Sequence, residues 1–138
     1  MLNKILLPSF IVLLLLKIGA LNFTTFNLFG DEAQYWLWSQ NIDFGYFSKP
    51  PFLSWIIRVY TEILGSSFFS LKLLPSFVYL LIAWSIYNLL INAGLNKKDS
   101  FAGCLIFLFI PAVSFSSFII STDLFLLLFW TLSLNELI

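Results

Sequence analysis

The chain has 138 residues, of which 60% are hydrophobic, 20% aromatic and only 10% charged, and its mean hydropathy is +0.96. A soluble domain of this length cannot bury so large an apolar fraction, since such domains carry about 25% charged residues. Seven basic and seven acidic residues cancel, which leaves no electrostatic case for a nucleic-acid partner. One cysteine and no histidine exclude a disulfide framework, a thiolate metal cluster and a histidine general base within the chain. We therefore expect a membrane protein whose chemistry depends on carboxylates, lysine, arginine and aromatic side chains.

Four apolar segments predict membrane-spanning helices, each of which needs about 20 mainly apolar residues. They are residues 5–23, 68–91, 101–120 and 124–138. The fold class expected is all-α, a multi-pass transmembrane protein of about four spans. Lys17 interrupts the first segment and Lys72 the second, and we expect both lysines to snorkel toward an interface. Pro75 and Pro111 are expected to bend or loosen their helices.

The positions of the lysines predict the orientation of the chain. Lys4, Lys97 and Lys98 lie in very short stretches, whereas residues 24–67 contain few basic side chains. The positive-inside rule then assigns the N-terminus and the Lys97 loop to the cytoplasm and residues 24–67 to the outer face. We expect a multi-pass protein of the plasma (inner) membrane, with its first helix retained rather than cleaved as a secretory signal.

The outer segment, residues 24–67, holds six of the fourteen charges and most of the Trp and Tyr residues. Such aromatic rings favour the headgroup level, so this segment is expected to lie on the membrane and to contact its lipids. Two short interfacial amphipathic helices are expected, over residues 32–40 and from residue 50 to residue 64, with a turn at residues 41–45. In the second helix, Ser54, Arg58 and Glu62 recur every four residues and predict a polar face opposite an apolar one.

Two adjacent acids, Asp31 and Glu32, open the first of these helices. They are candidates for a general base or for ligands of a divalent cation. They also fit a helix start, with Asp31 as N-cap, Gln34 three residues later as in a capping box, and Glu32 near the positive end of the dipole. Both interpretations can hold together, because a cap fixes a carboxylate in place.

Lys49 and Asp123 each have a structural and a functional interpretation. Lys49, before two prolines, is either an interfacial lysine or a compact cation for a lipid phosphate. Asp123 lies between two apolar runs, which marks either the N-cap region of the last helix or a functional acid. The orientation above predicts that Asp123 emerges on the same face as Asp31 and Lys49. Arg58 and Glu62 are spaced as an ordinary helical ion pair.

The stretch DEAQYWLWSQNIDFGYFSKPPFLSWII, residues 31–57, resembles the first outer loop of polyprenyl-phosphate-sugar-dependent membrane glycosyltransferases. These enzymes form the protein O-mannosyltransferase and aminoarabinose (lipid A) transferase superfamily, of GT-C type. The shared pattern is an Asp-Glu-Ala opening, an aromatic-rich helix and then Gly-Tyr-Phe-x-Lys-Pro-Pro. Ser-Thr-Asp at residues 121–123 resembles the second acid of the family. The resemblance implies transfer of a sugar from a polyprenyl-phosphate carrier to a lipid, glycan or protein acceptor on the extracytoplasmic side.

Carried onto this sequence, the resemblance implies catalytic roles for Asp31, Glu32 and Asp123. It also implies a contact between Lys49 and the carrier phosphate. The further substrate-binding residues expected are Tyr46, Tyr35 and Arg58. Ser48 stands where some relatives have an acid that takes part in metal binding, so a divalent cation is left open and no other cofactor is expected.

Enzymes of this superfamily are several times longer, so we expect residues 1–138 to form the N-terminal part of such an enzyme. Two other classes of protein remain open. One is a small four-span transporter or channel subunit, in which Asp123 and Lys17 are intramembrane polar groups. The other is a structural membrane partner without catalysis, which does not explain why acids, lysine and aromatics gather in one outer segment.

Overall fold

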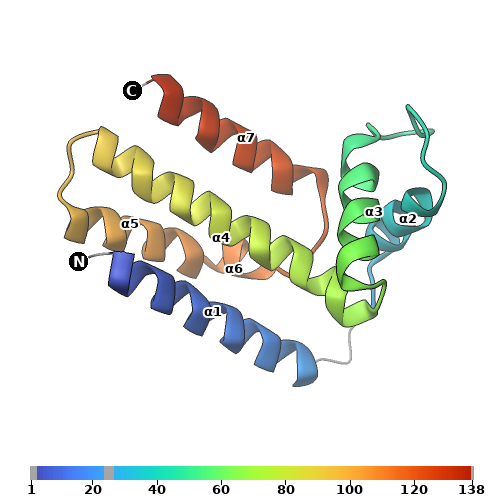
Figure 1. Ribbon diagram of the computed structural model, residues 1–138, viewed down its shortest axis with the longest axis horizontal. Helices are drawn as coiled ribbons and strands as arrows, with labels where there is room; N and C mark the ends of the chain where they lie inside the picture. The colour runs from blue at the N-terminus through green and yellow to red at the C-terminus, as the bar shows by residue number, and fades with distance from the viewer. Residues whose placement is uncertain (1–2, 24–26, 138) are drawn as a thin grey trace.

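The computed structural model describes residues 3–23 and 27–137, with side chains from residue 8 onward. These residues form seven helices and no strand, which confirms the all-α expectation. The helices are α1 (Asn3–Phe23), α2 (Gly30–Gln40), α3 (Phe52–Leu64), α4 (Phe68–Asn92), α5 (Lys97–Phe109), α6 (Pro111–Ser116) and α7 (Thr122–Leu137). Helix α4 runs through the middle and contacts α1, α5 and α7, while α2 and α3 stand across the end at which α4 begins (Figure 1).

Helix α4 is the one described helix that is long and apolar enough to cross a membrane. Its 25 residues extend about 37 Å at 1.5 Å per residue, against a hydrocarbon core of about 30 Å. The expected span 68–91 is therefore confirmed as a helix. Pro8–Phe23 within α1 forms a shorter apolar helix, so the expected count of four spans is not confirmed.

The expected third span, residues 101–120, is wrong as a single helix. Helix α5 ends at Phe109 and α6 begins at Pro111, with Ile110 extended between them at φ −57° and ψ 125°. A proline ring disfavours helical geometry in the residue before it and supplies no N–H for the helical ladder. Pro75 lies inside α4 without ending that helix.

The start of α2 also differs from the expected cap. The helix begins at Gly30 with Phe29 as N-cap, so Asp31 is the second helical residue and not the cap. Glu32, not Gln34, is the third helical residue, and its Oε2 accepts a hydrogen bond from the Phe29 N–H at 2.8 Å. The acid at this position thus reaches back to the cap backbone, as in a capping box.

One core joins the two short helices to α4 and α7. Its fully buried members include Ile57 of α3, Ile82 of α4 and Leu124 of α7. In α3 the buried side chains follow Leu53, Ile57 and Thr61, and Ser54 is buried with them, so the expected polar face of this helix is only partly exposed. This shared core fixes α2 and α3 against the beginnings of α4 and α7.

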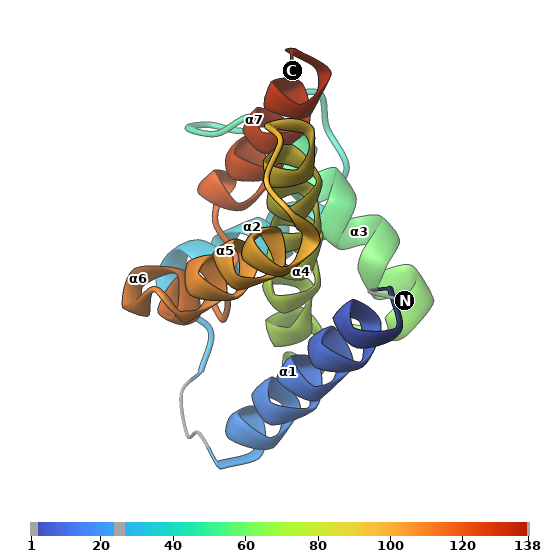
Figure 2. The same ribbon diagram turned by 90° about the vertical axis from the view of Figure 1, so that its left-hand side faces the viewer.

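The two ends of the bundle carry different groups. The N-terminal end of α1, the α4–α5 connection and the C-terminal end of α7 share one end, which faces the viewer in Figure 2. Helices α2 and α3 and the beginning of α7 lie at the other end (Figure 1). The segments that hold Lys97 and Asp123 are therefore at opposite ends of α4.

Candidate active site

The Glu32 carboxylate joins three parts of the fold at the end where α2 stands. Its side chain is fully buried, at 0% exposure. Oε2 accepts from the Phe29 N–H at 2.8 Å and lies 2.5 Å from the Lys72 ammonium, which α4 supplies. Oε1 accepts from the Ile120 N–H at 2.9 Å, in the segment that leads into α7. One carboxylate thus binds the beginnings of α2 and α7 to the first turns of α4.

Lys72 does not snorkel, contrary to the expectation from sequence. The residue is 3% exposed, and its ammonium pairs with Glu32 and lies 5.0 Å and 5.9 Å from the ring centroids of Phe29 and Phe68. A buried carboxylate needs a partner of opposite charge, because removing either member of a buried ion pair costs about 3–5 kcal/mol. An ionisable residue inside an apolar run often marks a functional site. Lys72 could therefore have been identified from the sequence as a candidate.

Asp31 and Asp123 are both exposed, unlike Glu32. Asp31 lies in the first turn of α2, and Asp123 lies in the first turn of α7. The hydrogen bond between Glu32 and Ile120 joins the first turn of α2 to the segment that leads into α7. Ile120 lies three residues before Asp123. Acidic side chains in the first turn of a helix also lie at the positive end of the helix dipole, which stabilises the helix.

Asp123 lines two cavities on the side of α7. One holds about 380 Å³, and its lining residues are Pro50, Phe52, Leu53, Thr122, Asp123, Phe125, Leu126 and Phe129. The other holds about 370 Å³ and is lined by Tyr79, Asp123, Leu126, Leu127 and Trp130. Among the described residues that line these cavities, Asp123 is the one acidic side chain. We call the first of them, between the start of α3 and α7, the Asp123 cleft.

Lys49 directly precedes Pro50, which lines the Asp123 cleft. Its ammonium lies 5.9 Å from the ring centroid of Tyr35, at the outer limit of a cation–π contact. Tyr35 is buried in α2, one turn after Asp31. The lysine is half-buried and has no described ion-pair partner, and its backbone adjoins the cleft through Pro50.

Tyr46 stiffens the connection that carries Lys49. Its ring stacks on Trp38 at 4.9 Å, and its hydroxyl lies 2.8 Å and 2.9 Å from the carbonyl oxygens of Asn41 and Trp38. The same hydroxyl accepts from the Asp43 N–H at 3.2 Å. An isolated antiparallel bridge joins Tyr46 to Lys49. Tyr46 therefore uses its hydroxyl within the loop and orients the backbone before Lys49.

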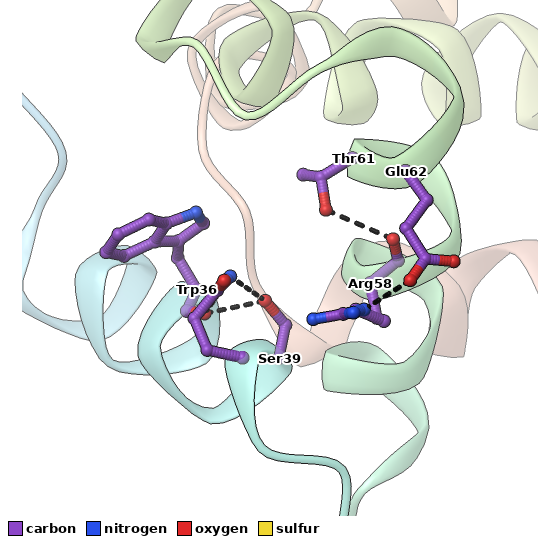
Figure 3. A network of polar contacts seen from close by, with 6 residues as sticks. Trp36, Ser39, Arg58, Thr61 and Glu62 are labelled. Atoms are coloured by element: carbon purple, nitrogen blue, oxygen red, sulfur yellow. Dashed lines mark hydrogen bonds and ion pairs between the residues drawn. The ribbon is translucent and has the colours of Figure 1, made fainter.

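Arg58 forms the expected ion pair with Glu62, with 2.7 Å between Nε and Oε1. Figure 3 shows this pair on α3, beside the end of α2 that carries Ser39. Ser39 donates to the Trp36 carbonyl at 2.6 Å, and Thr61 donates to the Arg58 carbonyl at 3.1 Å. Arg58 lines neither of the cavities next to Asp123.

A hydrogen bond fixes α3 against α4. The Tyr60 hydroxyl donates to the Ser70 carbonyl at 3.0 Å. Burial raises the pKa of Tyr60 above its ordinary value, so this hydroxyl keeps its proton and remains a donor. Together with the shared core, the bond orients the start of α3, and hence Pro50, toward α7.

Lys17 also has partners inside the bundle. Its ammonium donates to the Ser117 hydroxyl and lies 4.4 Å from the ring centroid of Phe118. Ser76 of α4 donates to the Ser117 carbonyl at 2.9 Å. Polar side chains thus join α1 and α4 to the segment between α6 and α7, as in other helical membrane proteins.

No group of three or more His, Cys, Asp or Glu side chains gathers in the part of the chain that the structure describes. Ser48, which lies beside Lys49, supplies a hydroxyl where the family resemblance implies an acid in some relatives. We assign no chemical step to a metal.

Comparison with known proteins defines the class of enzyme. Residues 48–137 match the family described as dolichyl-phosphate-mannose-protein mannosyltransferase, and the matched range covers more than half of the chain. The chain belongs to this family of glycosyltransferases. It is also 36% identical over 119 residues to lipid A galacturonosyltransferase RgtD of Rhizobium johnstonii. That alignment covers 86% of this chain and 25% of the relative. No solved structure matches the chain significantly.

The comparisons favour a glycosyltransferase over the small transporter that the composition had left open. The chain spans about a quarter of the length of the curated relative. Among the expected site residues, the structure places Asp123 in one cleft with Pro50, the residue after Lys49, and a hydrogen bond joins Glu32, next to Asp31, to Ile120 before α7. The structure does not bring Arg58 to that cleft.

Proposed function

We propose that this chain contributes the site at which a sugar leaves a polyprenyl-phosphate carrier and joins an acceptor at the extracytoplasmic face. The observation that carries the proposal is that Asp123 and Pro50, the residue next to Lys49, line the same cleft of about 380 Å³. A cleft with one acidic side chain, apolar walls and a lysine beside it suits a substrate with a hydrocarbon tail and a charged head. The arrangement of the basic residues supports the orientation, since Lys97 and Lys98 lie at the opposite end of α4.

The leaving group determines what the lysine is needed for. When the bond between the anomeric carbon and the phosphate oxygen breaks, the electron pair stays on the phosphate, which is already a stable anion. Such a leaving group needs a nearby cation and no proton donor. Lys49 suits that role, because an ammonium is a compact point charge for phosphate.

The acceptor needs a base. In the proposed step an acceptor hydroxyl attacks the anomeric carbon, a new C–O bond forms, and the hydroxyl proton passes to the Asp31 carboxylate. Asp123 then faces the positive charge that develops on the sugar ring, as the carboxylates of glycosidases do. General-base help of this kind is worth about 10²–10⁴-fold in rate.

The curated relative indicates which substrates to assay first. Its name gives lipid A as acceptor and galacturonic acid as sugar, and the family description gives mannose on dolichyl phosphate. We propose to express the protein from its complete gene in membranes and to supply polyprenyl-phosphate-linked mannose or galacturonic acid with lipid A. Sugar transfer that depends on the carrier lipid supports the proposal. Absence of transfer from every polyprenyl-phosphate donor contradicts it.

A further inference from the structure

We propose that Glu32 and Lys72 form a positioning pair, which fixes the backbone segments that carry Asp31 and Asp123 at one end of the bundle and itself touches no substrate. This inference rests on the function proposed above and reassigns Glu32, for which the family resemblance implies a catalytic role. The Glu32 carboxylate is buried and bonded on both oxygens. Both oxygens accept hydrogen bonds from groups of the protein, and the side chain is 0% exposed. A carboxylate buried in this way is closed off from an acceptor hydroxyl.

The Glu32 carboxylate connects the two segments that carry the exposed acids Asp31 and Asp123. Glu32 follows Asp31 directly in the first turn of α2. Its Oε1 holds the Ile120 N–H, three residues before Asp123 and 88 residues away along the chain from Glu32. The backbone that carries one exposed acid is therefore bonded, through Glu32, to the backbone that carries the other.

Glu32 and Lys72 form a buried ion pair in which each charge neutralises the other. Lys72 borders a cavity of about 450 Å³ whose other described lining residues are apolar, namely Ala20, Leu21, Phe29, Phe68, Phe115, Phe118 and Ile119. No second acid lines this cavity to neutralise the ammonium, and no second described cation bonds to Glu32. The two charges therefore depend on each other, and removing one leaves the other buried and unpaired.

This mutual dependence separates a positioning pair from a catalytic acid. A buried ion pair can often be replaced by two neutral groups of similar volume with little loss of stability. If Glu32 only positions, Glu32→Gln is harmful because it leaves Lys72 charged and alone, and a second change at Lys72 relieves that harm. If Glu32 acts on the substrate, no change at Lys72 restores activity.

The experiment compares Glu32→Gln, Lys72→Met, the double variant and Lys72→Arg, each made in the protein expressed from its complete gene. We expect each neutralising single variant to lower the melting temperature in detergent and to lower kcat about tenfold or more, with the KM for the lipid donor within about twofold. The double variant should regain most of the melting temperature and at least about tenfold in kcat over Glu32→Gln. Lys72→Arg should remain close to wild type, since it keeps the charge. Glu62→Gln, an exposed acid of α3, is the matched control and should leave kcat unchanged and lower the melting temperature only slightly.

Two outcomes overturn the proposal. One is a double variant that regains its melting temperature while its kcat stays as low as that of Glu32→Gln, which makes Glu32 a group that acts on the substrate. The other is a Lys72→Met variant with the kcat and melting temperature of wild type. Absence of sugar transfer by the wild-type protein contradicts the proposed function instead, and the melting temperatures still test the pair.

A distance measurement tests the positioning without an assay of activity. Spin labels at Gln34→Cys of α2 and Ser133→Cys of α7, both exposed positions, are introduced with Cys104→Ser. Glu32→Gln should broaden the distance distribution between the labels, and the added Lys72→Met should narrow it again. An unchanged distribution in Glu32→Gln contradicts a positioning role.

Discussion

The carboxylate of Glu32 accepts a hydrogen bond from the backbone N–H of Ile120 at 2.9 Å, across 88 residues of chain. This bond joins the first turn of α2 to the segment that leads into α7. It brings two exposed acids, Asp31 and Asp123, to the same end of the bundle. The proposed chemistry depends on that convergence, because neither helix alone carries both acids.

Lys49 tests the contact with the carrier phosphate. Lys49→Ala should raise the KM for the polyprenyl-phosphate donor about 10- to 100-fold, since a hydrogen bond to a charged group contributes about 1.5–3 kcal/mol. The KM for the acceptor should stay within about twofold. The measurement is steady-state transfer at varied donor concentration in nanodiscs. Lys49→Arg is the control and should keep most of the donor affinity, whereas an unchanged donor KM in Lys49→Ala removes the lysine from the site.

Substitutions at Arg58 and Glu62 test whether this ion pair contributes to substrate binding or only to the stability of α3. The pair is partly exposed, with side chains 39% and 59% accessible, and exposed pairs of this kind contribute about 0.2–1 kcal/mol. Arg58→Gln and Glu62→Gln should therefore change the donor KM by less than about twofold and lower the melting temperature only slightly. A donor KM that rises about tenfold in Arg58→Gln alone would return Arg58 to the substrate-binding residues.

Gly103 tests the packing of α5 against α4. A Cβ atom at this position would lie 2.5 Å from Cδ1 of Leu90, so the glycine allows a close approach of the two helices. Gly103→Ile should lower the melting temperature by several degrees, because overpacking costs about 1–3 kcal/mol. Ala102→Ile, at the exposed neighbouring position, should leave the melting temperature nearly unchanged. Equal melting temperatures for the two variants would show that this contact does not limit the packing.

The helices that were predicted well are those whose signal is local. Apolar length gave α4 within one residue at its end, and the proline pair before Phe52 and the glycine at residue 65 gave the limits of α3. High hydropathy across Pro111 predicted one span over residues 101–120, whereas the bend expected at Pro111 lies where α5 ends and α6 begins. The N-cap of α2 shifted because the Glu32 side chain, which has partners far along the chain, determines where that helix begins.

The site residues also divide into those that local sequence identifies and those that depend on long-range packing. Asp31, Lys49 and Asp123 could be named from local sequence, since each lies at the start of a helix or before prolines. The partner of Glu32 could not, because Lys72 is 40 residues away and only the packing of α2 against α4 brings the two charges together. Sequence spacing also made Lys72 resemble an ordinary lysine near the end of a span.

The most direct test of the central claim is the rate of sugar transfer by Asp31→Asn. The full protein is assayed in membranes with a polyprenyl-phosphate-linked sugar and lipid A, alongside Asp43→Asn, which removes an exposed acid from the α2–α3 connection. We predict that Asp31→Asn lowers kcat by about 10²–10⁴-fold with its melting temperature and donor KM unchanged, and that Asp43→Asn keeps the activity of wild type. Wild-type kcat in Asp31→Asn would contradict the account.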